Sequence, residues 1–377
     1  MGDVGRRVMI VAGEASGDAQ AALLVRSMRK LDPELSFFGV GGDEMAAAGV
    51  RVDIHVSELS IMGFTEAVAG IAHAWSSYRA LARQLRSKDR PDMLILVDFP
   101  EFNLVLARAA SRAGVRVFYY VSSQVWAWRR GRVRKIARRV DRMVVLFPFE
   151  VGVYERLGVD VHFVGHPLAE AVRPDRSPQQ VRRAYQAGIG RPLVALLPGS
   201  RQKELEANLP VMLDAADRLR AEADFVIALA PGLNADEVEK TWDCRDRKVA
   251  LAPSDTYNVV AASDAVAVTS GTATVECALL NTPMVVVYRM STASYVLARL
   301  LVRARFIAMP NIILGKKVVP ELIQGEATGE NIATCLHDLL HPRSSAAVRR
   351  ELTGVRDAVV RSGAANSAAT LALEIMP

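Results

Sequence analysis

VMIVAGEASGD, residues 8–18, places a short apolar run directly before a turn that contains two glycines. The run at 8–12 predicts a buried β-strand, and residues 18–30 predict the amphipathic helix that follows it. MLILVDFPEFN, residues 93–103, repeats this order, with a predicted strand at 93–97 and a helix at 101–112. Strand–turn–helix units of this kind are typical of an α/β protein.

Further apolar runs, separated by helical stretches such as residues 66–86, extend the pattern along the chain. They predict strands at residues 36–40, 115–121, 143–147 and 161–164, and then at 193–197, 224–230, 249–251, 265–269 and 284–287. Because these runs are apolar throughout and do not alternate, we expect parallel sheets that are covered by helices on both faces.

The pattern changes after His166, and residues 170–180 carry two prolines among charged residues, which predicts a linker. We therefore expect an α/β fold of two Rossmann-like domains, residues 1–170 and 171–344, whose parallel sheets face a central cleft. A C-terminal helix at about residues 345–377 is expected to pack back on the first domain.

The composition narrows the class of protein. A chain of 377 residues with 51% hydrophobic and 23% charged residues has enough apolar surface to fold into large cores. The net charge of +6 favours anionic partners, but the excess is concentrated at residues 129–142 and is not spread along a face with interleaved aromatics, so no nucleic acid is expected. Three distant cysteines without a CxxC spacing predict neither a disulfide nor a zinc site and fit a reducing cytoplasm. No apolar run approaches the length of a transmembrane helix.

The turn GEASGD, residues 13–18, is the first candidate ligand site, because ligands of such sheets bind beyond the carboxyl ends of the strands. Its glycines let a ligand approach the backbone, and the helix that follows offers free N–H groups. The turn matches neither the dinucleotide fingerprint nor a P-loop. The alternative is an ordinary strand-to-helix turn in which Asp18 is the N-cap.

DFPEFN, residues 98–103, offers a carboxylate at the same kind of position. Asp98 directly follows a predicted strand, where a general base can take a proton from a sugar hydroxyl. The alternative is that Asp98 serves only as a helix N-cap, since Pro100 can start the helix. Glu101 is the second candidate for the base.

SSQVWAWR, residues 122–129, combines aromatic and basic side chains in a predicted loop. Trp126 and Trp128 can stack on a sugar, and Arg129 can bind a phosphate. The alternative is that both tryptophans pack beneath the loop. The basic residues 130–142 either contact an anionic membrane or form a solvated helix face.

Two segments of the second half follow predicted strands in the same way. LPGSR, residues 197–201, forms a tight loop with a fixed positive charge at Arg201. In TSGTATVE, residues 269–276, Gly271 and Thr272 can hold a diphosphate and Glu276 can accept hydrogen bonds from a ribose. The alternative is a capping box between Thr272 and Glu276.

Metal ligands are not expected, because the sequence contains neither DxD nor HExxH. His166 is expected to be structural. A diphosphate leaving group would then be stabilised by helix N-termini and by Arg201.

The order of these segments resembles the lipid-A-disaccharide synthases. The motifs that carry the resemblance are GEASGD, FGVGGDEMAAAGV, LSIMGFTEA, DFPEFN, VWAWR, LFPFE, FVGHPL, LLPGSR, SGTATVECAL, PMVVVYRM, MPNIILG and VPELIQ, and they span about residues 8–324. The sequence departs from the usual pattern at residues 19–22 and at Ala327-Thr328, which puts the fine positioning of the substrates in question.

The resemblance implies a two-domain GT-B fold and an inverting glycosyl transfer without metal or cofactor. The implied donor is UDP-2,3-diacylglucosamine and the implied acceptor is 2,3-diacylglucosamine 1-phosphate (lipid X), which together give a β(1→6) disaccharide phosphate and UDP. It further implies peripheral binding to the anionic cytoplasmic face of the inner membrane of a Gram-negative organism, and a homodimer with an exchanged C-terminal part. Residues 63–78 would then present an apolar face either to lipid or to the core.

Carried over to this chain, the resemblance implies that Asp98 is the general base on the acceptor 6-hydroxyl. Together with the turn arguments it places the nucleotide-sugar at Glu14, Ser16, Gly17, Arg201, Ser270, Gly271, Thr272, Glu276, Asn311 and Gln324. Residues expected at the acceptor phosphate or the membrane are Trp126, Trp128, Arg129 and Arg132. The alternatives are another GT-B enzyme, such as a UDP-N-acetylglucosamine epimerase, and a non-catalytic protein that binds nucleotide or lipid.

Overall fold

The computed structural model describes residues 6–59, 67–121, 131–188, 190–291, 295 and 305–377. The chain forms two compact units, Met1–Pro167 with Arg361–Pro377, and Leu168–Val360. Each unit is built on one parallel sheet, as the apolar runs predicted.

The sheet of the first unit has the order β3-β2-β1-β4-β5-β6-β7 and is parallel throughout. Its strands are β1 (Arg7–Ala12), β2 (Ser36–Gly41), β3 (Arg51–His55), β4 (Met93–Val97), β5 (Arg116–Tyr120), β6 (Arg142–Val145) and β7 (Val161–Phe163). The strand order reverses between β1 and β4, which is where ligands of Rossmann-like sheets bind.

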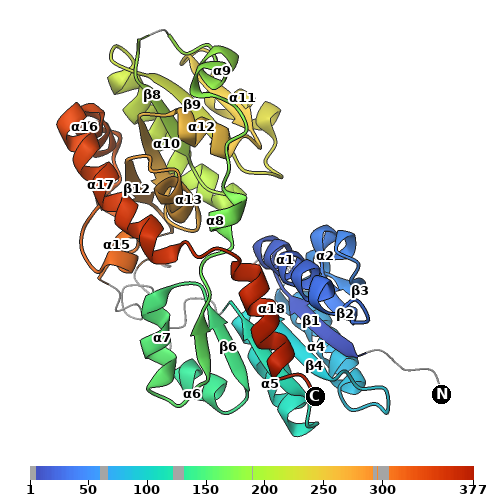
Figure 1. The fold of residues 1–377 in the computed structure, drawn as a ribbon. Helices are drawn as coiled ribbons and strands as arrows, with labels where there is room; N and C mark the ends of the chain where they lie inside the picture. Colours follow the sequence, from blue (N-terminus) through green and yellow to red (C-terminus); the bar gives the residue numbers. More distant parts are fainter. Residues whose placement is uncertain (1–5, 60–66, 122–130, 189, 292–294, 296–304) are drawn as a thin grey trace. The chain divides into compact units, whose positions relative to one another are not determined.

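Helices cover both faces of this sheet (Figure 1). Successive residues of β1 are buried on opposite faces. Met9 lies beneath α4 (Ala67–Gln84) and α5 (Pro100–Arg112), and Ile10 lies beneath α1 (Ala15–Leu31) and α18 (Ala364–Glu374). The helices are α1 (Ala15–Leu31), α2 (Asp43–Ala47), α3 (Val56–Leu59), α4 (Ala67–Gln84), α5 (Pro100–Arg112), α6 (Gly131–Ala137), α7 (Pro148–Glu155) and, from the C-terminus, α18 (Ala364–Glu374), which lies against α1.

The second unit repeats the design with the strand order β10-β9-β8-β11-β12-β13. Its strands are β8 (Leu193–Leu197), β9 (Asp224–Leu229), β10 (Val249–Pro253), β11 (Ala265–Thr269), β12 (Met284–Tyr288) and β13 (Glu321–Ile323). Its helices are α8 (Leu168–Ala171), α9 (Pro178–Ala184), α10 (Gln202–Leu219), α11 (Ala235–Trp242), α12 (Thr256–Ala262), α13 (Ala273–Leu279), α15 (Met309–Leu314), the 3-10 turn η1 (Gln324–Glu326), α16 (Gly329–Leu340) and α17 (Pro342–Val359). Here the order reverses between β8 and β11.

The structure differs from the sequence-based expectations in three respects. The edge strands β3 and β13 were missed, because their residues are only partly buried and lack a continuous apolar run. The expected linker contains the start of α9, and the expected C-terminal helix is two helices, of which only α18 belongs to the first unit.

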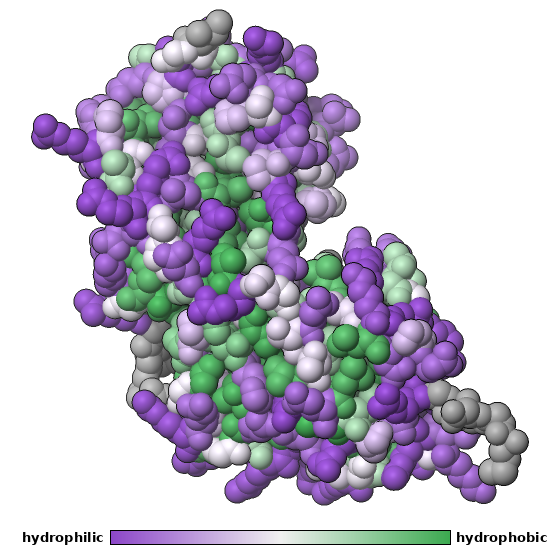
Figure 2. Space-filling model, viewed as in Figure 1, coloured by the Kyte–Doolittle hydropathy of each residue, from purple (hydrophilic) through white to green (hydrophobic). Residues whose placement is uncertain are grey.

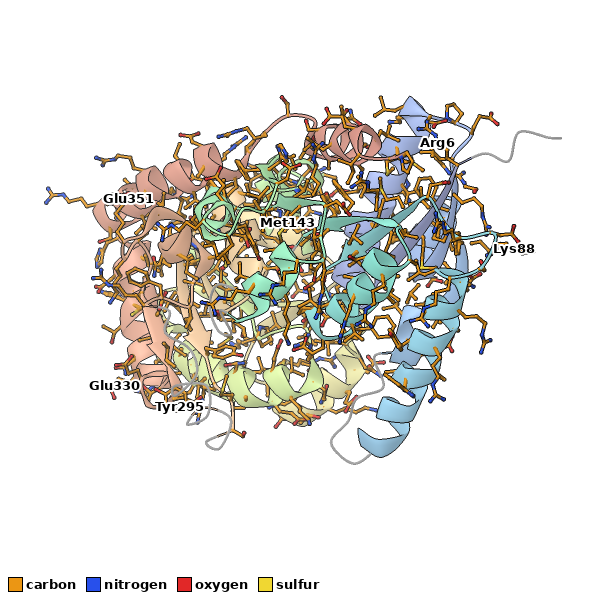
Figure 3. All side chains as sticks on the ribbon, turned by 90° about the horizontal axis from the view of Figure 1, so that it is seen from below. Arg6, Lys88, Met143, Tyr295, Glu330 and Glu351 are labelled. Carbon is orange, nitrogen blue, oxygen red and sulfur yellow. The ribbon has the colours of Figure 1, made fainter. Side chains whose placement is uncertain are left out.

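Polar and charged residues cover most of the face drawn in Figure 2. Seen from below in Figure 3, Arg6 and Lys88 lie toward one side of the first unit, just before β1 and in the loop before β4, while Met143 of β6 is fully buried. Arg6 and Lys88 therefore mark the amino edge of this sheet, opposite the carboxyl edge that carries the candidate site residues.

Candidate functional site

Four of the motifs that the sequence singled out meet in pairs at the two points where strand order reverses. In the first unit GEASGD follows β1 and DFPEFN follows β4, and these strands are paired up to Ala12 and Val97. In the second unit LPGSR follows β8 and TSGTATVE follows β11, which are paired up to Leu197 and Val268. Each unit thus brings two candidate ligand loops together at the position where this fold binds ligands.

The two loops of the first unit touch through Gly13 and Phe99. A Cβ atom at residue 13 would lie 2.2 Å from Cγ and 2.6 Å from Cβ of Phe99, so only glycine fits there. The Phe99 ring also stacks on Phe102, with ring centroids 5.6 Å apart. The GEASGD turn therefore forms one wall against which the DFPEFN turn is fixed.

Asp98 lies in a left-handed turn at the carboxyl end of β4. The backbone φ of Asp98 is 48° and that of Phe99 is 45°, in the left-handed region that residues other than glycine rarely adopt. Phe99 is the N-cap of α5, so Asp98 precedes the cap position and the alternative that it is the helix N-cap is wrong. Consecutive left-handed residues cost free energy and are found chiefly at functional sites.

Hydrogen bonds from β5 and α5 hold the Asp98 backbone. Its N–H donates to the carbonyl of Val121 at 2.9 Å, and Val121 itself has a φ of 62°. Its carbonyl accepts hydrogen bonds from Nδ2 of Asn103 at 2.7 Å and from the hydroxyl of Tyr119 at 3.0 Å. Burial, together with Asp98 and Tyr154, raises the pKa of Tyr119 well above its ordinary value, so Tyr119 remains a donor. Asp98 as a whole is half-buried.

Asp18 is not the helix N-cap that the alternative interpretation of this turn required. Helix α1 begins at Ala15 with Glu14 as N-cap, so Asp18 lies inside its first turn. Its buried carboxylate instead accepts hydrogen bonds from the N–H groups at the start of α2: Gly42 at 2.7 Å, Glu44 at 3.1 Å and Met45 at 3.2 Å. Glu14 and Ser16 are exposed, and Gly17 is buried beside Val97.

The PGSR loop leads directly into α10, of which Arg201 is the N-cap. Gly199 has a φ of 125°, and a Cβ there would lie 2.5 Å from Cβ of Glu204, so the turn requires glycine. Glu204 accepts a hydrogen bond from the N–H of Ser200 at 3.0 Å and lies 3.7 Å from Arg201. The Arg201 side chain is 70% exposed, so its guanidinium is accessible to an anion at the start of an 18-residue helix.

Side-chain hydrogen bonds hold the TSGTATVE loop. The hydroxyl of Ser270 donates to the carbonyl of Ile307 at 2.9 Å, and that of Thr274 to the carbonyl of Gly271 at 2.8 Å. Gly271 has a φ of 152°, and a Cβ there would meet no atom within 4 Å. The backbone at Gly271 is thus open to a ligand, and Thr272 next to it is exposed.

Glu276 is held by Tyr257, whose hydroxyl donates to Oε1 at 3.2 Å. Thr272 makes no side-chain cap, so the capping-box alternative is wrong. Burial raises the pKa of Glu276 above its ordinary value, although the bond from Tyr257 opposes this shift. A half-buried acceptor fixed in this way suits a sugar or ribose hydroxyl.

Asn311 and Gln324 are committed to holding the backbone. The buried Nδ2 of Asn311 donates to the carbonyl of Val319 and to Glu321, and its Oδ1 accepts from the N–H groups of Val318 and Val319, all at 2.7–2.9 Å. Gln324, whose φ is 52°, pairs its amide with the N–H and carbonyl of Met290 at 2.7 and 3.0 Å. A direct bond from the Asn311 amide to a nucleotide would require one of these bonds to break.

Glu321 completes the second-unit site and was missed from the sequence. Its carboxylate accepts hydrogen bonds from the N–H groups of Ile307 and Ala308, at 3.1 and 2.9 Å, and from Asn311 at 2.8 Å. It therefore fixes the segment that anchors Ser270. Its partners Ile307 and Asn311 lie 14 and 10 residues earlier in the sequence, and the only local signal was the VPELIQ motif. Tyr119 was missed in the same way, because it lies within a strand that reads as core.

Trp126, Trp128 and Arg129 lie outside the described residues, as does the side chain of Arg132. The described part of the basic segment meets α5, where Arg139 donates to the carbonyl of Leu104 at 2.8 Å. Burial lowers the pKa of Arg139, and the neighbouring charges of Arg108, Arg112 and Arg138 lower it further.

His166 is structural. Its ring is 3% exposed and lies 5.2 Å from the ring of Phe147. Burial lowers its pKa to about 4, so the imidazole is neutral at physiological pH.

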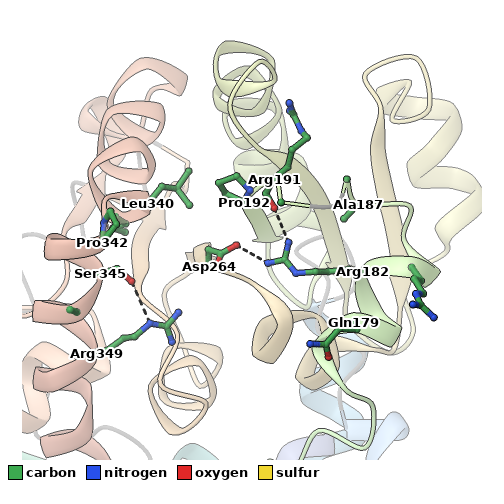
Figure 4. Close-up of a pocket in the computed structure, with 15 residues that line it drawn as sticks. Gln179, Arg182, Ala187, Arg191, Pro192, Asp264, Leu340, Pro342, Ser345 and Arg349 are labelled. Carbon is green, nitrogen blue, oxygen red and sulfur yellow. Dashed lines mark hydrogen bonds and ion pairs between the residues drawn. The ribbon is translucent and has the colours of Figure 1, made fainter.

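A pocket of about 780 Å³ lies at the opposite edge of the second sheet (Figure 4). It opens beside Asp264 and Pro192, which precede β11 and β8. Its Arg182 is bound to Asp264 at 2.8 Å and to the carbonyl of Arg191 at 2.8 Å. Arg182 thus connects the segments that precede β8 and β11, at the amino ends of these strands. This pocket is therefore separate from the candidate site at their carboxyl ends.

Comparisons with known proteins identify the family of this chain. The sequence model of the family described as lipid-A-disaccharide synthetase matches residues 8–375. Lipid-A-disaccharide synthase of Geobacter metallireducens is 44% identical over 378 residues, with 98% of this chain and 97% of the relative covered. The protein of the same name from Geobacter sulfurreducens is 42% identical over 374 residues, with the same coverage.

Solved structures show the same fold at much lower identity. UDP-GlcNAc 2-epimerase from Neisseria meningitidis bound to UDP-GlcNAc has a TM-score of 0.64 and 12% identity, with 98% of both chains covered. A ugt transferase from Siraitia grosvenorii in complex with UDP has a TM-score of 0.62 and 13% identity, with 98% of this chain and 100% of that chain covered. These likenesses confirm the predicted two-domain GT-B type of fold. The family match over nearly the whole chain decides between the alternatives, and the chain belongs to the lipid-A-disaccharide synthase family of glycosyltransferases.

Proposed function

We propose that the protein transfers a diacylglucosamine from its UDP derivative to the 6-hydroxyl of 2,3-diacylglucosamine 1-phosphate, with inversion at the anomeric carbon. Asp98 takes the proton of the hydroxyl, the hydroxyl oxygen bonds to the anomeric carbon, and the bond from that carbon to the diphosphate breaks to release UDP. The observation that carries the proposal is the strained turn that holds Asp98 where the strand order reverses.

On the acceptor side, the first unit supplies the base and the GEASGD wall. The left-handed turn holds Asp98 directly before Phe99, the N-cap of α5, at the carboxyl end of β4. General base catalysis by a positioned side chain contributes about 10²–10⁴-fold to a rate. Glu101, the second candidate, lies in the first turn of α5 and is exposed, which makes it the weaker choice.

On the donor side, the second unit supplies groups for UDP. Arg201 at the start of α10 suits the diphosphate, since a guanidinium and free helix N–H groups both favour anions. The open backbone at Gly271 lets a phosphate approach, with Ser270 and Thr272 on either side. Glu276 suits the ribose hydroxyls.

Contact with an anionic membrane is part of the proposal. No helix among the described residues is long and apolar enough to span a bilayer. The exposed side chains near Arg139 are basic: Arg108 and Arg112 on α5, and Arg138. Val105, also on α5, is 44% exposed. Like charges held together are relieved by anionic lipid, at about 1 kcal/mol per residue. The homodimer with exchanged C-terminal parts remains a prediction from the resemblance; within this chain α18 packs on α1.

The test is a reaction of purified protein with both lipid substrates, in which UDP and disaccharide are measured together. Equal amounts of both products are expected. UDP without disaccharide would indicate hydrolysis, and conversion of the donor to an epimer would favour the epimerase alternative.

Asp98→Asn should keep UDP affinity and lower turnover by about two orders of magnitude or more, because the amide cannot accept the proton. Glu101→Gln is the matched control and should retain most of the turnover. Wild-type turnover in Asp98→Asn would remove Asp98 from the mechanism.

A further inference from the structure

We propose that Tyr119 and Asn103 are positioning residues, which act on the reaction by holding Asp98 in its left-handed conformation. The inference rests on the proposed function, in which Asp98 is the general base. It concerns the carbonyl of Asp98 and not its carboxylate, so it assigns a task to two side chains that do not reach the substrate.

The conformation of the turn is not one that its residues would choose. Asp98 and Phe99 both have positive φ, and no glycine is present to accept it. An aspartate visits this region with little penalty, but a phenylalanine does so only when its surroundings enforce it. Without such an enforcing contact, rotation of the peptide that follows Asp98 would redirect its side chain.

The enforcing contacts converge on that peptide. The carbonyl oxygen of Asp98 accepts two hydrogen bonds, from Nδ2 of Asn103 at 2.7 Å and from the Tyr119 hydroxyl at 3.0 Å. Nδ2 of Asn103 also donates to the carbonyl of Val97 at 3.2 Å. Both donors are 0% exposed, so water cannot replace either of them.

The buried side chain of Asn103 lowers the stability of the fold unless its hydrogen bonds serve a purpose. Its Oδ1 is buried and has no hydrogen-bond partner among the residues that the structure describes. A buried acceptor without a partner lowers stability, and leucine or alanine would pack in an α-helix without that cost. The amide is therefore explained by its two donor hydrogens, which both bind carbonyls at the end of β4.

Tyr119 comes from a different element and reaches the same oxygen. It lies on β5, which pairs with β4, and its ring belongs to the core between the sheet and α5. The adjacent Tyr120 is equally buried but faces the opposite core. Loss of the Tyr119 hydroxyl therefore has a matched control in loss of the Tyr120 hydroxyl from the same strand.

The experiment compares Tyr119→Phe with Tyr120→Phe in the full-length protein, with kcat, KM and UDP affinity as readouts. Tyr119→Phe should lower kcat about 10- to 100-fold, as expected for a displaced catalytic group, with KM and UDP affinity changed by less than about two-fold. Tyr120→Phe should change kcat less than about two-fold. Equal kcat values for the two variants would overturn the inference.

A double-mutant cycle separates positioning from general damage. In the Asp98→Asn background Tyr119→Phe should lower the residual kcat by less than about two-fold, because no base remains to be positioned. Multiplication of the two effects would overturn the inference. If Tyr119→Phe gives little folded protein, Asn103→Ser provides the same comparison, since it removes the second donor to the same oxygen. A wild type that forms no disaccharide refutes the proposed function instead, so the two failures are distinct.

Discussion

Gly13→Ala should damage the site without touching any residue that binds or reacts. The added Cβ would lie 2.2–2.6 Å from three side-chain carbons of Phe99, whereas ordinary contact begins at about 3.4 Å. Rotation of the ring does not relieve the overlap, because the Cβ of Phe99 is among the three atoms. The backbone of Phe99, and with it Asp98, must therefore move by roughly 1 Å.

Two magnitudes follow from that displacement. Overpacking of a well-packed site costs about 1–3 kcal/mol, which for a domain of about 150–250 residues lowers Tm by about 2–12 °C. A misplacement of about 1 Å in a catalytic group costs about 10²-fold in rate. We therefore expect a large loss of kcat together with a moderate loss of stability.

The assay measures thermal unfolding and the release of UDP and disaccharide for Gly13→Ala and two controls. Gly17→Ala is the control for stability, because its Cβ would lie 3.6 Å or more from its neighbours and alanine suits a helix. Gly152→Ala in α7, where a Cβ meets nothing within 4 Å, is the control for activity. The reasoning would be refuted if Gly13→Ala kept the kcat and Tm of the wild type. It would also be refuted if the Tm of Gly17→Ala were as low as that of Gly13→Ala.

Two further predictions concern pH and membranes. The pKa of His166 is about 4 in the folded protein and 6.5 in the unfolded chain, so between these values only the unfolded chain binds the proton. The free energy of unfolding should therefore be highest above pH 6.5 and should fall by up to about 3 kcal/mol as the pH drops toward 4. Urea unfolding at several pH values should show this loss in the wild type and not in His166→Phe; parallel curves would contradict it. Replacement of Arg108, Arg112 and Arg138 by glutamine should weaken sedimentation with phosphatidylglycerol vesicles about 10²-fold and leave binding to neutral phosphatidylcholine unchanged; unaltered sedimentation would exclude this face.

The sequence predicted the strands that are buried on both faces and the loops that follow them. β4, β8 and β11 were predicted with their observed bounds, since such strands carry a continuous apolar run. The motifs could be assigned to the carboxyl edge because parallel strands fix the direction of every loop. The sequence did not predict β3 or β13, because their partly buried residues form no continuous apolar run.

The sequence alone also determined that Asp98 follows a strand, but it left open whether Asp98 is a helix cap. Only the tertiary structure decided this, by placing the cap at Phe99 and both residues in the left-handed region. The same holds for Tyr119 and Glu321, whose partners Asp98 and Ile307 lie 21 and 14 residues earlier in the chain. Local patterns encode strands, turns and helices, because these depend on neighbouring residues. Hydrogen bonds between separate segments form only once the sheets have brought the strand ends together. The roles of the residues that make these bonds can therefore be seen only in the folded chain.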